Sequence, residues 1–142
     1  MQSKPADTTQ ASEFFPRPYF FYGRLSDPGF WTGRLGLEEA PKFEDAEIRG
    51  WDLKMWGHYK AVVKTKERGK VVKGVMYMLQ NKEMLEKIAA YQTDKYCVRW
   101  CVIHHGYVSE GCVFAFAGDT STLKTVEEYE LEQRAYRELK AM

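Results

Sequence analysis

Three short segments of this 142-residue chain carry residue types and spacings that could do chemistry. The first is YGRLSDP at 22–28, where Gly23 forms a turn just before a helix start at Asp27 and Pro28. Such a turn leaves several backbone N–H groups free, and these can hold an anionic group. An ordinary strand-to-helix loop has the same local pattern, so both interpretations stay open at this point.

The second segment is YQTDKY at 91–96, which joins a predicted helix to a predicted strand. It brings together two tyrosines, an amide and a carboxylate, but a helix end with an Asp-stabilised turn would look the same and is favoured on local grounds. The third segment is WGHYKAVV at 56–63, which is aromatic and interrupted by glycine. Taken alone, it indicates packing rather than chemistry.

Metal and thiol chemistry have little support in the sequence. His104 and His105 are adjacent, so in a strand they point to opposite faces. Cys97 and Cys101 share a face but lie roughly 13 Å apart along an extended strand, too far for a disulfide or a common ligand sphere. Together with Cys112 they fall in apolar runs, where a buried, inert thiol is the usual outcome. No phosphate-binding glycine motif occurs, and we expect neither a metal nor an organic cofactor.

Composition narrows the class of protein further. There are 21 Lys and Arg against 20 Asp and Glu, with no block of like charge, which argues against a nucleic-acid partner. Hydrophobic residues make up 44% of the chain and aromatic residues 15%, enough for a core without disulfides or a structural metal. The odd number of cysteines, the lack of a secretory signal and the lack of a long apolar run predict a cytoplasmic protein that does not enter membranes. We expect a disordered tail at residues 1–13 and one domain at 14–142.

The elements that must position these segments follow from apolar periodicity and capping residues. Strands are expected at 19–23, 51–55, 59–63, 71–79, 96–104 and 112–117; helices are expected from Asp27 through Leu35, from Asn81 to Gln92, and after the Thr125 and Glu128 capping box. Gly74 is expected to allow a bulge or a close backbone approach. Short turns between neighbouring strands predict an α+β fold, with a mixed, mostly antiparallel sheet and helices at its edges.

Four motifs, in order along the chain, resemble the gamma-glutamylcyclotransferase-like family, also called AIG2-like, and especially its fungal branch. They are a Y-G-x-L loop at 22–25, a G-Y-P-A-L-V-like strand at 57–63, a G-x-x-Y strand at 74–77 and the branch's Y-E-T-D-x-Y at 91–96. The resemblance covers about residues 19 to 117, and a final helix is also usual in that branch.

The resemblance implies a small closed or nearly closed mixed β-barrel with flanking helices and a pocket at the Y-G-x-L loop. In the family reaction the α-amine of a gamma-glutamyl group attacks its own γ-carbonyl and releases an amine and 5-oxoproline. Backbone groups of Tyr22, Gly23, Arg24 and Leu25 would hold the substrate, and one carboxylate would move the proton. Such an enzyme acts on a small molecule without a cofactor, and we expect a monomer or homodimer.

One departure from the family pattern bears directly on catalysis. Gln92 stands where the branch carries its catalytic Glu, and an amide cannot accept a proton at ordinary pH. Loss of a general base costs about 10²–10⁴-fold in rate. Three explanations stay open: an authentic cyclotransferase inactivated by a Glu→Gln change, an enzyme that diverged to another cyclisation, elimination or isomerisation, and a non-catalytic binding pseudoenzyme.

Other residues near the motifs offer alternative proton carriers. Tyr59 and Tyr96 are the nearest candidate donors, and His58 and Asp94 are candidate bases. The leading hypothesis is therefore a small-molecule enzyme of this fold, of the kind often found in specialised metabolism.

Two basic substitutions bear on the substrate. Arg24 replaces a small Thr or Ser of the family loop, and Lys60 replaces a proline. If either faces the pocket, an anionic or oxygen-rich ligand is expected. If both face solvent, they carry no information about it.

Overall fold

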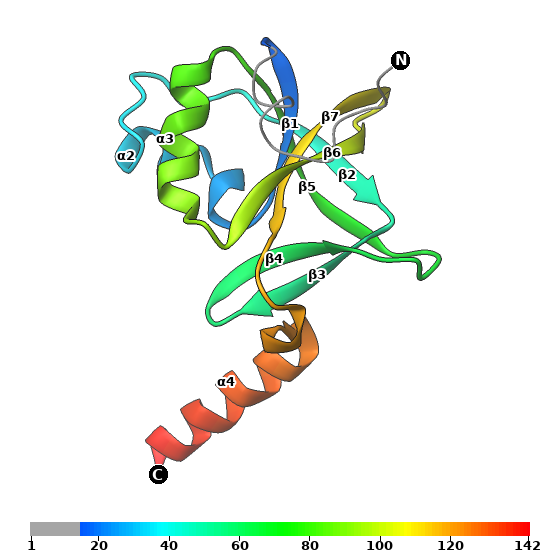
Figure 1. Ribbon diagram of the computed structural model, residues 1–142. Coiled ribbons are helices and arrows are strands. Elements are labelled where there is room, and N and C mark those ends of the chain that lie inside the picture. Colours follow the sequence, from blue (N-terminus) through cyan, green and yellow to red (C-terminus); the bar gives the residue numbers. More distant parts are fainter. Residues whose placement is uncertain (1–14) are drawn as a thin grey trace.

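The centre of the computed structural model, which describes residues 15–142, is a closed β-barrel with strand order β1–β5–β2–β6–β7 (Figure 1). Its strands are β1 (Arg17–Phe21), β2 (Glu44–Arg49), β5 (Val71–Leu79), β6 (Tyr96–His104) and β7 (Val108–Phe116). Neighbouring strands pair antiparallel except β1 and β7, whose parallel pairing closes the barrel. The α+β barrel expected from the motifs is thus confirmed, whereas the predicted tail at 1–13 lies outside the described residues.

A second sheet flanks the barrel. It has the order β4–β3–β8 and consists of β3 (Trp51–Trp56), β4 (Tyr59–Lys64) and β8 (Lys124–Thr125). The Tyr22 hydroxyl joins this sheet to the barrel, because it donates to the Phe114 carbonyl oxygen at 2.6 Å and accepts from the Val62 N–H at 3.2 Å. The hairpin of β3 and β4 is therefore tied to the barrel at the Y-G-x-L segment.

Strand β1 is buried on both faces, which explains its uninterrupted aromatic run. Phe20 packs with Ile48 and Val113 in one hydrophobic cluster. Its neighbours Tyr19 and Phe21 point the other way, into a second cluster that includes residues of the helices. A strand covered on both sides is apolar at successive positions instead of alternating.

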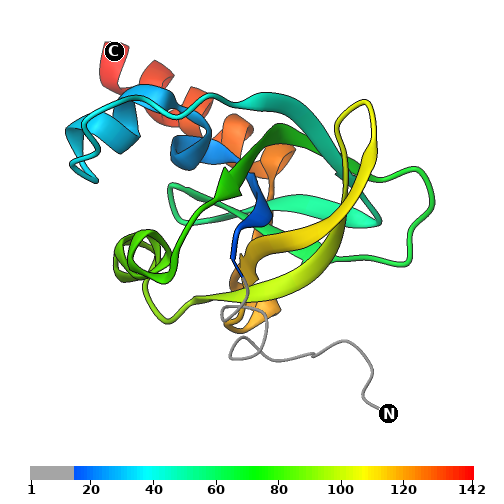
Figure 2. The ribbon, with the colours of Figure 1, turned by 90° about the horizontal axis from the view of Figure 1, so that it is seen from above.

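Within residues 15–142, three α-helices accompany the strands: α2 (Pro28–Gly33), α3 (Lys82–Gln92) and α4 (Val126–Ala141). Two short 3-10 turns in the same range are η1 (Gly23–Ser26) and η2 (Thr120–Thr122). The predicted caps are confirmed, since Asp27 accepts from the Gly29 N–H and Asn81 from the Met84 N–H. Helix α3 lies against the outside of the barrel (Figure 2) and buries Leu85 and Ile88.

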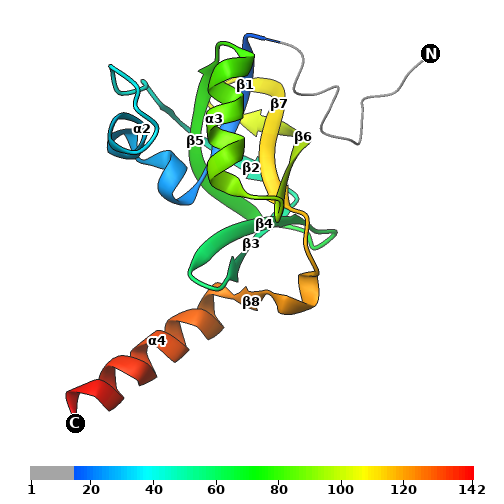
Figure 3. The same cartoon turned by 60° about the vertical axis from the view of Figure 1, so that its left-hand side comes forward.

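Helix α4 extends away from the barrel beyond the second sheet (Figure 3), and none of its residues is buried. It starts at the predicted capping box, in which Thr125 and Glu128 each accept from the other's backbone N–H. No helix within residues 15–142 is long and apolar enough to cross a membrane.

The structure departs from the predicted elements in two places. Strand β2 was not expected, because its sequence EDAEIR buries only Ala46 and Ile48 and is otherwise polar. The first α-helix ends at Gly33 rather than including Leu35, which packs from the following loop against the core. The expectation for Gly74 is confirmed, since a Cβ there would lie 2.3 Å from the Phe21 carbonyl oxygen.

The cysteines behave as packing residues. Cys101 and Cys112 are buried, Cys97 is partly buried, and all three are free thiols. Burial raises the pKa of Cys112 to about 11 and also raises that of Cys101. A thiol that stays protonated at neutral pH is a poor nucleophile, so the expected structural role is supported.

Candidate active site

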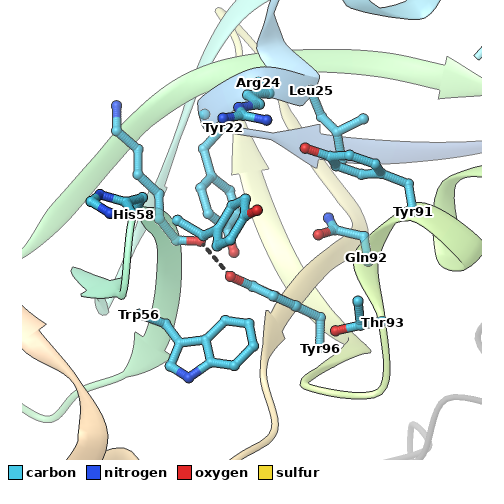
Figure 4. Close-up of a pocket in the computed structure, with 12 residues that line it drawn as sticks. Tyr22, Arg24, Leu25, Trp56, His58, Tyr91, Gln92, Thr93 and Tyr96 are labelled. Atoms are coloured by element: carbon cyan, nitrogen blue, oxygen red, sulfur yellow. Dashed lines mark hydrogen bonds between the residues drawn. The ribbon is translucent and has the colours of Figure 1, made fainter. Parts of the chain in front are cut away.

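A cavity of about 470 Å³ lies between η1, the β3–β4 hairpin and the junction of α3 with β6 (Figure 4). Its walls come from three segments that are far apart in the sequence: Tyr22, Gly23, Arg24 and Leu25; Trp56, His58, Tyr59 and Lys60; Tyr91, Gln92, Thr93 and Tyr96. This volume is in the range of small-molecule sites, about 300–1,000 Å³. The three segments singled out by their residue types thus meet at one site.

The loop at one end of the cavity is held in a fixed turn. Gly23 has φ +65°, a conformation that costs little only for glycine. The Ser26 hydroxyl donates to the Gly23 carbonyl oxygen at 2.6 Å, and the Trp31 indole N–H donates to the Leu25 carbonyl oxygen at 2.9 Å. These two hydrogen bonds hold the turn that forms this wall of the cavity.

Two tyrosine hydroxyls at the cavity are bonded to backbone carbonyls. Tyr96 donates to the Lys60 carbonyl oxygen at 2.9 Å, which connects β6 with β4 across the cavity. Burial, followed by the neighbouring Tyr91 and Tyr59, raises the pKa of Tyr96 to about 12. Burial also raises the pKa of Tyr22 well above its ordinary value. Both phenols are therefore neutral at physiological pH.

The amide side chain of Gln92 lies at the cavity. Gln92 is the last residue of α3, and no hydrogen bond of its carboxamide is found within residues 15–142. The next residue, Thr93, has φ 70° and ψ 175°, a region that is otherwise almost restricted to glycine and costs of order 1–3 kcal/mol. The backbone strain at Thr93 therefore occurs directly after Gln92 in the chain.

Replacing Thr93 by glycine is expected to raise the free energy of unfolding by about 1 kcal/mol, because relief of strain exceeds the extra backbone entropy of glycine. Urea denaturation of Thr93→Gly measures it. The Lys95 N–H bond to the Thr93 hydroxyl, at 3.3 Å, is lost in this variant, so Thr93→Ser serves as the control that keeps the bond and the strain. A loss of stability in Thr93→Gly would show that the conformation is not strained.

His58 connects the cavity to the C-terminal helix. Its Nδ1 lies 2.8 Å from the Tyr129 hydroxyl of α4, with the two rings nearly perpendicular at 81°. Tyr129 therefore fixes the orientation of a ring that lines the cavity, which makes it a positioning residue.

The variant Tyr129→Phe is expected to change the imidazole tautomer ratio of His58, seen in ¹⁵N NMR, because the His58 ring loses its hydrogen-bond partner. Tyr136→Phe is the matched control, since Tyr136 is an exposed tyrosine on the same helix. The free energy of unfolding should change by less than about 0.5 kcal/mol in both. An unchanged His58 spectrum in Tyr129→Phe would contradict the positioning role.

Eight of the nine residues predicted from the sequence line the cavity: Tyr22, Gly23, Arg24, Leu25, His58, Tyr59, Gln92 and Tyr96. Asp94 is not among the lining residues, and its side chain is exposed. Trp56, Lys60, Tyr91 and Thr93 also line it and were not among the predicted site residues, although each lies inside or next to a motif. Tyr77, another motif aromatic, instead packs against Trp31 with ring centroids 5.3 Å apart.

A second cavity, of about 510 Å³, lies on another part of the barrel and includes Asp45, Lys73 and His104. Among residues 15–142, no group of three or more histidine, cysteine and acidic side chains is arranged to hold a metal ion.

Comparison with known proteins identifies relatives of this architecture. A family model described as gamma-glutamyl cyclotransferase, AIG2-like, matches residues 19–138. A search of curated protein sequences returned no match.

Three solved structures share the fold at low sequence identity. The solution structure of an Arabidopsis thaliana protein aligns with a TM-score of 0.64 at 17% identity, covering 91% of this chain and 89% of that one. A second Arabidopsis thaliana protein gives 0.64 at 13%, covering 88% and 78%. A structure named gamma-glutamyl cyclotransferase gives 0.56 at 14%, covering 72% and 67%.

Proposed function

Because this chain belongs to the gamma-glutamyl cyclotransferase, AIG2-like family, we propose that it is an enzyme that converts a small molecule inside the cavity between η1 and α3. The reaction is a cofactor-free intramolecular cyclisation, elimination or isomerisation. Family membership supports small-molecule, cyclotransferase-like chemistry in general, and the specific reaction is our inference. Assignment to the fungal branch rests on the sequence at 91–96 and stays a prediction.

The observation that carries this proposal is the carboxamide of Gln92 at the cavity, with no hydrogen-bond partner in residues 15–142. An amide N–H can donate to a substrate carbonyl oxygen and polarise it, but the side chain cannot act as a base. Polarisation together with enforced proximity suits intramolecular reactions, in which correct positioning alone supplies much of the rate.

The proton must then be moved by another group. His58 lines the cavity from the β3–β4 hairpin, across from Gln92 in Figure 4. When its Nδ1–H donates to Tyr129, the Nε2 lone pair is left to accept a proton. Tyr59, half exposed at the same wall, is a phenol that can return one. We therefore assign the base to His58 and the acid to Tyr59.

The test is direct assay of conversion. The protein is incubated with gamma-glutamyl amines and with unsaturated or keto acids able to cyclise, and products are followed by liquid chromatography with mass spectrometry. Gln92→Ala is expected to lower turnover about tenfold by loss of one hydrogen bond. Gln80→Ala is the control, because that amide lies outside the cavity and bonds only to the Met78 carbonyl among the described residues. Turnover that is equal in both variants would remove Gln92 from the mechanism.

If no compound is converted but ligands bind, the protein is a binding pseudoenzyme on the same scaffold. A third outcome is that the native protein converts no compound of any kind, while Gln92→Glu converts gamma-glutamyl compounds and no others. In that case an authentic cyclotransferase inactivated at this residue becomes the better description.

A further inference from the structure

Within residues 15–142, the charged side chains that line the proposed active site are all basic. Arg24 and Lys60 line the cavity together with the ionisable His58, and no Asp or Glu is among its lining residues. Acidic and basic residues are almost equally frequent in the chain, 20 against 21. The absence of carboxylates here is therefore a property of this cavity and not of the composition.

Both cations are available to a ligand. Neither Arg24 nor Lys60 forms an ion pair with a residue of the described part of the chain. The Arg24 guanidinium lies over the Tyr59 ring, 5.5 Å from its centroid, which keeps the charge at the cavity. The Lys60 side chain runs past the turn, since a Cβ on Gly23 would lie 3.7 Å from its Cβ and Cδ. Figure 4 shows Arg24 at the end of the cavity formed by this loop.

Flat aromatic rings form the rest of the walls. Trp56 contacts Tyr59 and Tyr96, with ring centroids 6.2 and 6.1 Å away. The Tyr91 ring packs edge-to-face against Phe30, and the two ring centroids are 4.7 Å apart. Such rings stack well on a planar, unsaturated body.

We propose that the substrate is a planar organic acid: a carboxylate attached to an aromatic or conjugated body, without an ammonium group. The carboxylate lies between Arg24 and Lys60, where the planar guanidinium can bind it through two parallel hydrogen bonds. The body stacks against Trp56 and Tyr96, and the Gln92 amide donates to a second oxygen. The inference rests on the proposed function, because it takes this cavity to be the active site.

An ammonium group is disfavoured for a physical reason. Among residues 15–142 no carboxylate lines the cavity to pair with a positive charge, and Arg24 and Lys60, which do line it, repel one. A gamma-glutamyl group carries such an ammonium. The native cavity should therefore discriminate against gamma-glutamyl compounds, although the scaffold is shared with proteins named for them.

Four probes with the same ring test the inference on the full-length protein: 2-naphthylacetate, its neutral amide 2-naphthylacetamide, 2-naphthylethylamine and gamma-glutamyl-2-naphthylamide. Binding is measured by isothermal titration calorimetry at two salt concentrations. The carboxylate is expected to bind at least about tenfold more tightly than the other three, since a charge-assisted hydrogen bond is roughly twice as strong as a neutral one. Its affinity should fall with added salt.

Matched variants test whether Arg24 and Lys60 cause the preference for the carboxylate probe. Arg24→Gln and Lys60→Gln should each reduce the advantage of the carboxylate over the amide about threefold to tenfold, and the double variant should abolish it. Both side chains are exposed, so the variants should fold, which thermal denaturation checks. Arg68→Gln is the control, since it removes an exposed arginine outside the cavity.

Failure of the planar-acid inference and failure of the proposed enzyme function give different results in these experiments. Equal or tighter binding of the amine or the gamma-glutamyl probe overturns the inference, as does no carboxylate binding at millimolar concentration or an unchanged preference in the double variant. If the carboxylate is preferred but no compound is ever converted, the inference stands and the proposed enzyme fails. If the native protein converts a gamma-glutamyl compound, an enzyme is upheld and the planar acid is wrong.

Discussion

Replacing Gly111 with alanine is expected to lower the free energy of unfolding by about 3 kcal/mol, because the new methyl group has no room. A Cβ at this position would lie 2.3 Å from the Pro18 carbonyl oxygen and 2.7 Å from Ile103 Cδ1. The first contact is with backbone, which cannot rotate away as a side chain can. It also lies beside the parallel pairing of β1 with β7, where Tyr19 faces Cys112 and the barrel closes.

Urea denaturation at fixed pH gives the free energy of unfolding of Gly111→Ala and of a control, Gly33→Ala. Gly33 is in α2, has no atom within 4 Å of a Cβ position and does not have a positive φ. The control should therefore change stability by no more than about 0.5 kcal/mol. A loss below about 1 kcal/mol in Gly111→Ala would show that β1 and β7 can separate freely, and the close approach would then not determine barrel closure.

Local signals explain which elements could be predicted from the sequence. The caps at Asp27, Asn81 and Thr125 predicted three helix starts, because these side chains satisfy N–H groups that a helix leaves unpaired. The parallel pairing of β1 with β7 could not be predicted this way, since it joins segments about 90 residues apart. Gly74 was recognised from its place inside an apolar run, whereas Gly111 follows a polar stretch and carries no comparable signal.

The sequence allowed the three segments of the candidate site to be named, but it did not allow the arrangement of their side chains around one cavity to be predicted. The residue types at 22–25 and 91–96 were compatible with chemistry but equally with ordinary turns, and only the family resemblance indicated a pocket at the 22–25 loop; the structure brings both segments to one cavity. Asp94 and Gln92 are two positions apart, yet only Gln92 lines the cavity. Between them lies Thr93 with its positive φ, and no local rule predicts that conformation for a β-branched residue.

The variant Gln92→Glu is expected to raise the release of 5-oxoproline from gamma-glutamyl compounds about 10²–10⁴-fold above the uncatalysed background that is measured with the native protein, the range that general-base catalysis supplies. A carboxylate at this position provides two things that the Gln92 amide does not. It accepts a proton from the attacking ammonium, and it offers that ammonium a counter-charge among Arg24 and Lys60.

The same substitution should weaken binding of a planar carboxylate, because the new negative charge faces it in the cavity. Gln80→Glu is the control: it adds the same charge outside the cavity and should change neither activity nor binding. A coupled assay of 5-oxoproline and calorimetry with 2-naphthylacetate measure the two effects on one set of proteins. If Gln92→Glu releases no more 5-oxoproline than the native protein, a carboxylate at position 92 is not sufficient for cyclotransferase activity in this cavity, and the prediction is wrong.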